Sequence, residues 1–246
     1  MIKLAVAGAQ GRMGKSIVGI ALSIKKDVCI VKALFESKER TDLAKEFQGV
    51  PIYTDLSALQ GCDVLIDFTT PHAVLDNLEA CEKYNVGMVI GTTGLSPAEI
   101  GFVENASKNI PIVFSSNMSF GVNVLFKLIE QTSKTMKNFF NKIVIEETHH
   151  EHKKDKPSGT AKTMREIAEQ FSGTRISDDD MISHREGEVV GDHTIIYETP
   201  FDTITISHHA KTRDMFAIGA VNAAEWLMEN KKKNGLYNMK DVFGLK

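Results

Sequence analysis

Residues 3–18, KLAVAGAQGRMGKSIV, carry the pattern that decides the fold of this chain of 246 residues. An apolar run leads into Gly8, and Gly11 and Gly14 follow before a segment with helical spacing. Set on the dinucleotide fingerprint, the stretch reads Ala9-x-Gly11-x-x-Gly14 with Gly8 in front, which departs slightly from G-x-G-x-x-G. Glycines at these places allow a tight turn and let backbone N–H groups approach a pyrophosphate. The stretch therefore predicts a strand, a turn and a helix that together hold a dinucleotide.

Short apolar runs and longer segments with helical spacing alternate up to about residue 111. The apolar runs are residues 2–7, 28–35, 63–68, 88–90 and 112–114, and the helical segments lie near residues 11–25, 71–84 and 96–108. Buried parallel strands read as continuous apolar runs, and their alternation with helices is typical of βαβ units. The first half of the chain is therefore predicted to be an α/β, Rossmann-like domain with a parallel sheet.

The pattern changes from about residue 119, because strands now follow one another. Helices are predicted over residues 120–136, 158–171 and 215–229, and strands over residues 142–148, 193–198 and 203–208. Clustered strands accompanied by helices indicate a second domain of the α+β class.

A carboxylate is expected about 20 residues after the glycines, where it would bind the adenosine ribose hydroxyls. Glu36 lies at that place, at the end of VKALFE. Its charge favours NAD because it would repel the 2′-phosphate of NADP, yet Lys38 and Arg40 are close enough in sequence to offset that repulsion. An ordinary surface glutamate is the alternative, and the choice between NAD and NADP stays open.

Three further strand ends carry small, polar residues. They are Phe68-Thr69-Thr70-Pro71, Gly91-Thr92-Thr93-Gly94 and Ser115-Ser116-Asn117-Met118. In open α/β sheets, ligands bind outside the carboxyl ends of the strands. Each loop alone could be a simple turn, but together with the glycine turn they are predicted to line the ribose and nicotinamide.

The stretch of residues 146–161, EETHHEHKKDKPSGTA, is predicted to carry the chemistry. If the strand continues, His149 and His150 point to opposite faces and have different roles. Ser158 can cap a new helix, whose first turn, with Gly159 and Thr160, is a site for anions. Lys153, Lys154 and Lys156 add positive charge. These features predict a substrate with at least one carboxylate and suggest two.

This segment has two other interpretations. A histidine-rich cluster can bind zinc, but no cysteine is near in sequence and three lysines would repel a cation, so no metal is expected. The segment could instead be a solvated polar loop, which is the better interpretation for His152.

With these motifs in place, the chain resembles the 4-hydroxy-tetrahydrodipicolinate reductase family, also called dihydrodipicolinate reductase. The resemblance spans nearly the whole chain through GAQGRMG (8–14), DFTTP (67–71), GTTG (91–94), NMSFGVNV (117–124), residues 146–161 and GLYNMKDV (235–242). It implies reduction of a cyclic dicarboxylate to tetrahydrodipicolinate by NADH or NADPH, in the diaminopimelate route to lysine. It also implies a homotetramer assembled through the second domain's sheet.

The resemblance assigns roles by position. It implies that the cofactor contacts Gly8, Ala9, Gln10, Gly11, Arg12 and Met13, with Glu36 at the ribose and Gly91, Thr92, Thr93, Ser115, Ser116, Asn117 and Met118 on the nicotinamide side. His149 matches the family's acid/base residue, Lys153 its proton donor, and His150, Gly159 and Thr160 its substrate contacts. Which of His149 and Lys153 delivers the proton after hydride transfer stays open. Many relatives carry arginine where this chain has Ser37, which weakens the case for NADP.

With the last helix packing back on the first domain, as the resemblance implies, the predicted dinucleotide domain is 1–118 plus 213–246. The predicted domain for substrate binding and oligomerisation is 119–212.

Composition narrows the class of protein. A formal net charge of −3 gives no overall basic field for nucleic acid or membrane, and no apolar stretch approaches membrane-spanning length. Three widely spaced cysteines without a Cys-x-x-Cys favour a reducing compartment, so the cytoplasm is expected.

Two alternatives share the nucleotide half. Another two-domain dehydrogenase, acting on a sugar or an amino-acid semialdehyde, would not explain the histidine–lysine segment. A non-catalytic redox sensor would need no acid/base cluster.

Overall fold

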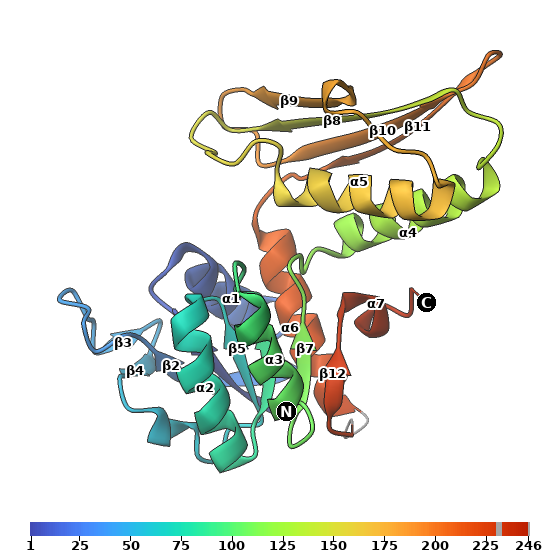
Figure 1. Cartoon of the computed structure of the whole chain (residues 1–246). Helices are drawn as coiled ribbons and strands as arrows, with labels where there is room; N and C mark the ends of the chain where they lie inside the picture. The colour runs from blue at the N-terminus through green and yellow to red at the C-terminus, as the bar shows by residue number, and fades with distance from the viewer. Residues whose placement is uncertain (230–232, 246) are drawn as a thin grey trace. The chain divides into compact units, whose positions relative to one another are not determined.

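The computed structural model describes residues 1–229 and 233–245, which form two compact units (Figure 1). The first comprises Met1–Ser119 and Asp214–Gly244, and the second is chiefly Phe120–Arg213. Each boundary lies one residue beyond the place predicted from the sequence, because Ser119 belongs to the first unit and Arg213 to the second. Among the described residues, no helix is long and apolar enough to cross a membrane.

The described part of the first unit is built on an eight-stranded sheet of order β12-β7-β6-β5-β1-β2-β4-β3. The strands are β1 (Ile2–Ala7), β2 (Cys29–Phe35), β3 (Glu46–Phe47), β4 (Val50–Tyr53), β5 (Val64–Asp67), β6 (Gly87–Ile90), β7 (Pro111–Phe114) and β12 (Gly235–Tyr237). All neighbours pair in parallel except β3 with β4. Strands β5 and β6 are buried along their whole length and β1 is buried from Leu4 to Ala7, which is why these stretches are almost entirely apolar. The predicted Rossmann-like α/β fold is confirmed.

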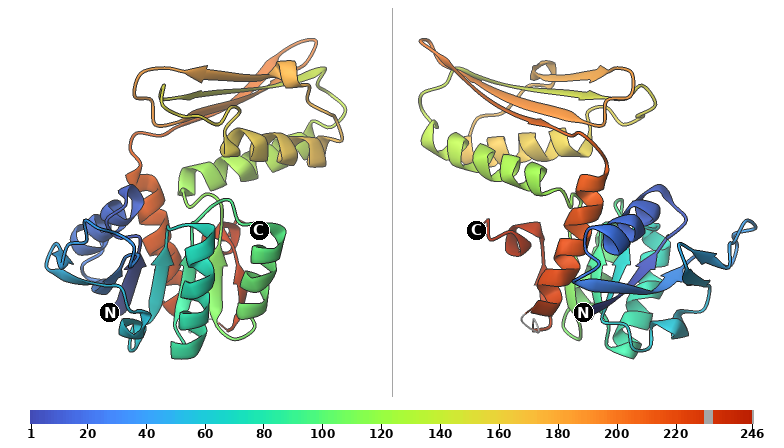
Figure 2. Two further views of the ribbon diagram at one scale, coloured as in Figure 1. Left: turned by 60° about the vertical axis from the view of Figure 1, so that its left-hand side comes forward. Right: turned by 180° about the vertical axis from the view of Figure 1, so that it is seen from behind.

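Helices cover both faces of this sheet (Figure 2). One core joins α1 (Arg12–Ser23) and α6 (Asp214–Glu229) to the sheet, and the other joins α2 (Pro71–Tyr84) and α3 (Pro97–Ala106). The sequence marks the starts of α2 and α3, since Thr70 caps α2 and Ser96 forms a capping box with Glu99. Two short helices, η1 (Leu56–Leu59) and α7 (Met239–Val242), complete the unit.

The second unit has a four-stranded sheet of order β11-β10-β8-β9. Its strands are β8 (Lys142–His149), β9 (Met181–Arg185), β10 (Asp192–Glu198) and β11 (Thr203–His209), and its helices are α4 (Phe120–Thr135), α5 (Gly159–Ser172) and the short η2 (Asp178–Asp180). Helices α4 and α5 pack on the same face of the sheet (Figure 1). Alternate residues of β10 are buried, as expected of a sheet covered on one face.

Several elements were not predicted from the sequence: β3, β4, β9, β12 and α7, each of five residues or fewer. Strand β8 also runs one residue further than predicted, to His149. That residue is therefore inside the sheet, while His150 begins the loop that follows.

Candidate active site

The glycine turn has the geometry of a dinucleotide cradle. Gly8 follows β1 with φ of +73°, and the Gly11 N–H donates to the Gly8 carbonyl at 3.0 Å. Gly11 precedes α1, and among the described residues no side chain caps that helix, which leaves the N–H groups of its first turn available to an anion. Gly14 lies so close to the turn that a Cβ there would sit 2.1 Å from the Gly8 oxygen. These features fit a bound pyrophosphate.

Glu36 holds the same loop from the end of β2. Its Oε1 accepts a hydrogen bond from the Gln10 N–H at 2.5 Å, and its Oε2 lies 3.5 Å from the Arg40 guanidinium. Arg40 also pairs with Asp42 at 2.6 Å, and this hydrogen bond holds the pKa of Asp42 below its usual range. A cleft of about 820 Å³ opens beside these residues, lined by Gly8, Gly11, Glu36, Lys38, Arg40 and Thr70 among others.

The remaining predicted cofactor residues are a mixture of loop and core positions. Ala9 is fully buried and Met118 is 1% exposed, and both side chains belong to the core around α1 and α6. Arg12, Thr93 and Ser116 are exposed, and Met13 is half-buried. Because the side chains of Ala9 and Met118 are buried, only their backbone atoms are left to contact a ligand.

The loops after β5 and β6 are joined by Asp67, which sequence reasoning missed. Its Oδ1 accepts from the hydroxyls of Thr92 and Thr69, both at 2.7 Å, and its Oδ2 from the Asn77 amide at 2.6 Å. Thr92 is only 4% exposed, so its side chain holds the loop together rather than facing outward. The sign in the sequence was an acidic residue at the end of an otherwise apolar strand.

The loops after β6 and β7 also lie together, as predicted, because these strands are neighbours. The Ser115 N–H donates to the Ile90 carbonyl, and the Ser115 hydroxyl donates to the Asn117 carbonyl at 3.0 Å. Gly91 is needed where it stands, since a Cβ there would lie 2.2 Å from the Phe68 ring. The structure thus brings the predicted nicotinamide-side residues to one edge of the sheet.

In the second unit, the predicted chemical residues gather at the end of β8 and the start of α5. His149 is 7% exposed on the face of the sheet that the helices cover, whereas His150 is half-buried in the loop, where its N–H donates to the Val189 carbonyl. Burial and the nearby Arg213 charge lower the pKa of His150 below its ordinary value. Lys153 pairs with Asp155 at 2.7 Å. Helix α5 begins at Gly159 and Thr160, after Ser158 caps it by accepting from the Ala161 N–H.

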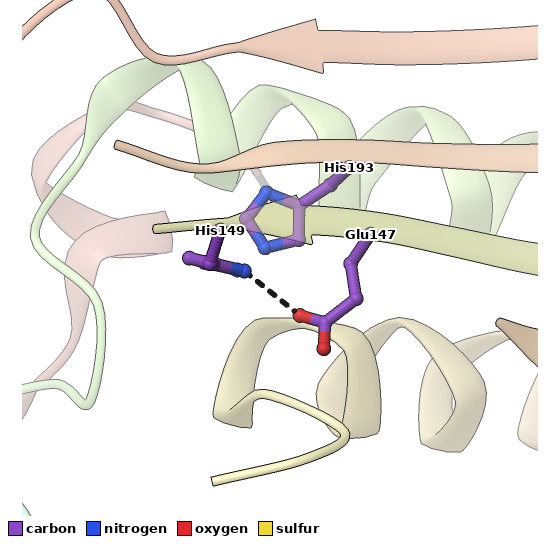
Figure 3. Close-up of side chains that lie close together, drawn as sticks. All are labelled: Glu147, His149 and His193. Carbon is purple, nitrogen blue, oxygen red and sulfur yellow. Dashed lines mark ion pairs between the residues drawn. The ribbon is translucent and has the colours of Figure 1, made fainter. Parts of the chain in front are cut away.

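Three residues that the sequence analysis did not single out complete this site: Glu147, Arg185 and His193. Glu147 Oε2 lies 3.1 Å from His149 Nδ1 (Figure 3). Its Oε1 receives the Arg185 guanidinium at 3.1 Å. Burial by itself raises the pKa of Glu147, but the neighbouring His149, Ser158 and Ser183 outweigh it and hold that pKa well below its usual range. Glu147 is therefore ionised at neutral pH.

His193 comes from β10, where it is the register partner of Glu147, and its ring packs edge-on against His149 at 5.0 Å between centroids (Figure 3). Burial lowers the pKa of His193 to about 4, with the neighbouring His149 as the next cause. His193 is therefore a neutral ring that packs beside His149 at neutral pH.

The nearest approach to a metal site among the described residues is Glu147, His149 and His193, whose candidate ligand atoms lie within 4.8 Å of one another. This trio differs from the histidine run considered in the sequence. Its carboxylate already receives the Ser158 N–H at 3.0 Å and the Arg185 guanidinium. A cation there would face a positive charge across the same carboxylate, which disfavours it.

Comparisons with known proteins agree over the whole length. Residues 2–118 match the family described as dihydrodipicolinate reductase, N-terminus, and residues 121–243 match its C-terminus. The 4-hydroxy-tetrahydrodipicolinate reductase of Trichlorobacter lovleyi is 40% identical, with all of both chains covered. That of Nitrosomonas europaea is 39% identical, covering 100% of this chain and 99% of the relative. A dipicolinate-bound dihydrodipicolinate reductase from Paenisporosarcina sp. TG-14 has a similar fold, with a TM-score of 0.81, 24% identity and 97% of each chain covered.

Proposed function

The chain belongs to the dihydrodipicolinate reductase family and reduces 4-hydroxy-tetrahydrodipicolinate with NADH or NADPH, and we propose that His149 and Lys153 supply the proton that completes this reaction. When bound, the reduced nicotinamide supplies a hydride. Loss of the substrate's 4-hydroxyl as water gives a conjugated ring. Hydride addition to that ring leaves an enamine-like carbon that must be protonated, so a positioned acid is needed. The pathway is the diaminopimelate route to lysine, which the family implies.

One observation supports the assignment above the others: residues 149–160 combine a buried imidazole, a lysine and the start of a helix within one short segment. An imidazole can donate or accept a proton, and the helix start and the lysines favour a carboxylate. We propose that His150, Gly159 and Thr160 contact the substrate and that His149 and Lys153 face its reacting carbon. Replacing both of the latter side chains tests this, because either one alone could take over from the other.

The first unit is proposed to hold the cofactor. Gly8–Met13 would face the pyrophosphate, Glu36 the adenosine ribose, and the loops at Gly91–Thr93 and Ser115–Met118 the nicotinamide side. Support comes from the uncapped start of α1, the close approach of Gly14 to Gly8 and the cleft beside Glu36.

We propose that Arg40 decides whether NADPH is accepted. It stands beside Glu36, and the residue that follows Glu36 is the uncharged Ser37. Arg40→Ala is expected to raise the KM for NADPH roughly 10-fold, which corresponds to one charge-assisted hydrogen bond, and to leave the KM for NADH nearly unchanged. The measurement is oxidation of both cofactors side by side, with substrate generated in the cuvette from pyruvate and aspartate semialdehyde.

Asp42→Asn is the matched control for Arg40, because it removes Arg40's competing carboxylate and keeps the guanidinium. The Asp42→Asn variant is expected to have the same KM for NADPH as the wild type or a lower one. An equal change in both cofactors' KM in Arg40→Ala would show that Arg40 does not discriminate between them.

A homotetramer is also proposed, assembled through the sheet face of the second unit that α4 and α5 leave uncovered. Support comes from the family resemblance and from apolar side chains on that face, among them the half-buried Ile182 and Ile196. Light scattering is expected to give four times the 27.2 kDa chain mass. Ile196→Glu would place a charged side chain from each subunit in the symmetric interface. The variant is therefore expected to dissociate, which lowers the measured mass. An unchanged mass would exclude this face.

The proposed compartment is the cytoplasm, supported by cysteines at positions 29, 62 and 81 that are buried and unpaired. The proposed ligands are small molecules, without nucleic acid or membrane partners.

A further inference from the structure

A buried carboxylate stands behind the proposed acid. Glu147 lies two residues before His149 on β8, so both side chains project from the same face of the sheet (Figure 3). The Glu147 side chain is 1% exposed and that of His149 is 9% exposed. A buried charge is costly unless it is paired, so the partners of this carboxylate indicate why it is there.

The first partner is the imidazole itself. Oε2 of Glu147 lies 3.1 Å from Nδ1 of His149, which is an ion-pair distance, and neither of these buried atoms has a hydrogen-bond partner elsewhere among the described residues. Because an ionised carboxylate can only accept, a proton on Nδ1 is the arrangement that gives both buried atoms a partner. The other ring nitrogen, Nε2, is then the one that exchanges a proton with a ligand. Gly191 leaves space at that nitrogen, since a Cβ there would lie 3.0 Å from Nε2.

The second partner is the start of α5. Oε1 of Glu147 accepts a hydrogen bond from the backbone N–H of Ser158 at 3.0 Å. Ser158 is the capping residue of that helix, immediately before Gly159 and Thr160. The carboxylate therefore sets the distance between the imidazole and the helix start proposed to bind the substrate.

The third partner reaches the lysine loop. Arg185 on β9 donates to Oε1 of Glu147 at 3.1 Å, to the Lys153 carbonyl at 3.3 Å and to the Asp155 carbonyl at 2.5 Å. One guanidinium thus ties the loop that carries Lys153 to the same carboxylate. The fork of Arg185 suits this, because its donors point in fixed directions.

We propose that Glu147 is a positioning residue that fixes the tautomer of His149 and, with Arg185, holds His149, Lys153 and the start of α5 in one arrangement. This inference rests on the proposed function of His149. Glu147 does not touch the substrate; it acts through the groups that do. No metal is needed for this role, since Arg185 already balances the carboxylate charge.

The test is Glu147→Gln. The amide oxygen can still accept from Ser158 and Arg185, but the amide N–H₂ would face Nδ1 and force the ring into the opposite tautomer. kcat is expected to fall by on the order of 100-fold, with the Kd for NADH unchanged. Proton transfer should become slower relative to hydride transfer. The solvent isotope effect on kcat is therefore expected to rise and the isotope effect of cofactor deuterated at the transferred position to fall, which a merely structural role would not produce.

A double-mutant cycle separates this inference from the proposed function. In a His149→Gln background, adding Glu147→Gln is expected to lower kcat by less than about a further 3-fold, because the imidazole that Glu147 positions is already gone. If the two losses multiply instead, Glu147 does not act through His149 and the inference fails while the function of His149 stands. If His149→Gln and its double variant with Lys153→Gln keep full turnover, the proposed function itself fails.

The matched control is Glu130→Gln. Glu130 is also a buried glutamate of the second unit, 7% exposed, and hydrogen bonding to Lys134 lowers its pKa to about 2. Glu130 lies on α4, away from His149 in sequence. The Glu130→Gln variant is expected to be less stable than the wild type and to keep its kcat. A similar loss of kcat in both variants would overturn the proposal.

Two further variants test the same arrangement in case Glu147→Gln does not fold. Glu147→Asp keeps the charge and is expected to recover part of the lost rate. Arg185→Lys leaves Glu147 and His149 in place and is expected to lower kcat about 10-fold through the Lys153 loop. Full activity in Glu147→Gln or Arg185→Lys would refute the arrangement, as would activity that EDTA abolishes and Zn²⁺ restores in the wild type.

Discussion

Replacing His149 and Lys153 together with glutamine is expected to lower kcat by roughly 10²- to 10⁴-fold, the usual range for losing general acid catalysis. Both side chains belong to one segment of the second unit, and the proposed intermediate cannot collapse to product without a proton. The residues of the glycine turn are untouched, so the Kd for NADH is expected to stay within about 2-fold of wild type. Stopped-flow oxidation of NADH with freshly generated substrate measures the first quantity, and fluorescence titration the second.

The control for this pair is the double variant His152→Gln, Lys137→Gln. It also removes one imidazole and one ammonium from the second unit, but from exposed positions. Its kcat is expected to match wild type. Wild-type turnover in His149→Gln, Lys153→Gln would remove both residues from the mechanism and leave the hydride-transfer half of the reaction intact. Dipicolinate, a planar dicarboxylate, should still bind that variant if Gly159 and Thr160 hold a carboxylate.

The sequence was most informative where burial is continuous. Strand β1 is predicted with its observed ends because every residue from Leu4 to Ala7 is buried and apolar, and Lys3 alone breaks the run near its start. Helix α2 is also predicted with both ends, since Thr70 and Pro71 mark its start and Asn85 adopts a left-handed conformation at its end. Local chemistry determines such boundaries, and local chemistry can be read from sequence.

The sequence was least informative where pairing between distant segments decides the structure. Strand β9 exists because it pairs with β8, and only that pairing brings Arg185 to Glu147. His193 meets His149 through the register of β10 on β8. Nothing within a few residues of Arg185 or His193 indicates these contacts. The buried Glu147 also looks like the polar half of an alternating strand, and only its partners distinguish it from a surface residue.

Polar residues at strand ends were correctly expected to lie together, but their separate roles were not visible. The GTTG motif places Thr92 among the cofactor residues, yet its hydroxyl donates a hydrogen bond to the Asp67 carboxylate. Met118 is placed there by NMSF, yet its side chain lies in the core, where α6 approaches so closely that a Cβ on Gly219 would be 1.9 Å from the Met118 oxygen. A motif indicates which loop approaches a ligand, and packing decides which atoms of that loop are free to touch it.

Gly14→Ala is expected to have the largest effect in the first unit. The new methyl group would lie 2.1 Å from the Gly8 oxygen and 2.5 Å from the Ala9 Cα, and both neighbours are backbone atoms that no side-chain rotation can move. Helix α1 would have to shift away from the turn. We expect a loss of about 3 kcal/mol in the free energy of unfolding and at least a 10-fold weaker Kd for NADH, because the N–H groups of the turn and the helix no longer converge.

Gly19→Ala in the same helix is the matched control for Gly14→Ala. A Cβ at Gly19 would meet nothing within 4 Å, so the substitution brings only alanine's higher helix propensity. It is expected to stabilise the protein by up to about 1 kcal/mol and to leave the Kd for NADH unchanged. Urea unfolding and NADH fluorescence titration of both variants give the comparison. If Gly14→Ala were as stable as Gly19→Ala and bound NADH equally well, the close approach of helix and turn would not be what shapes the dinucleotide site.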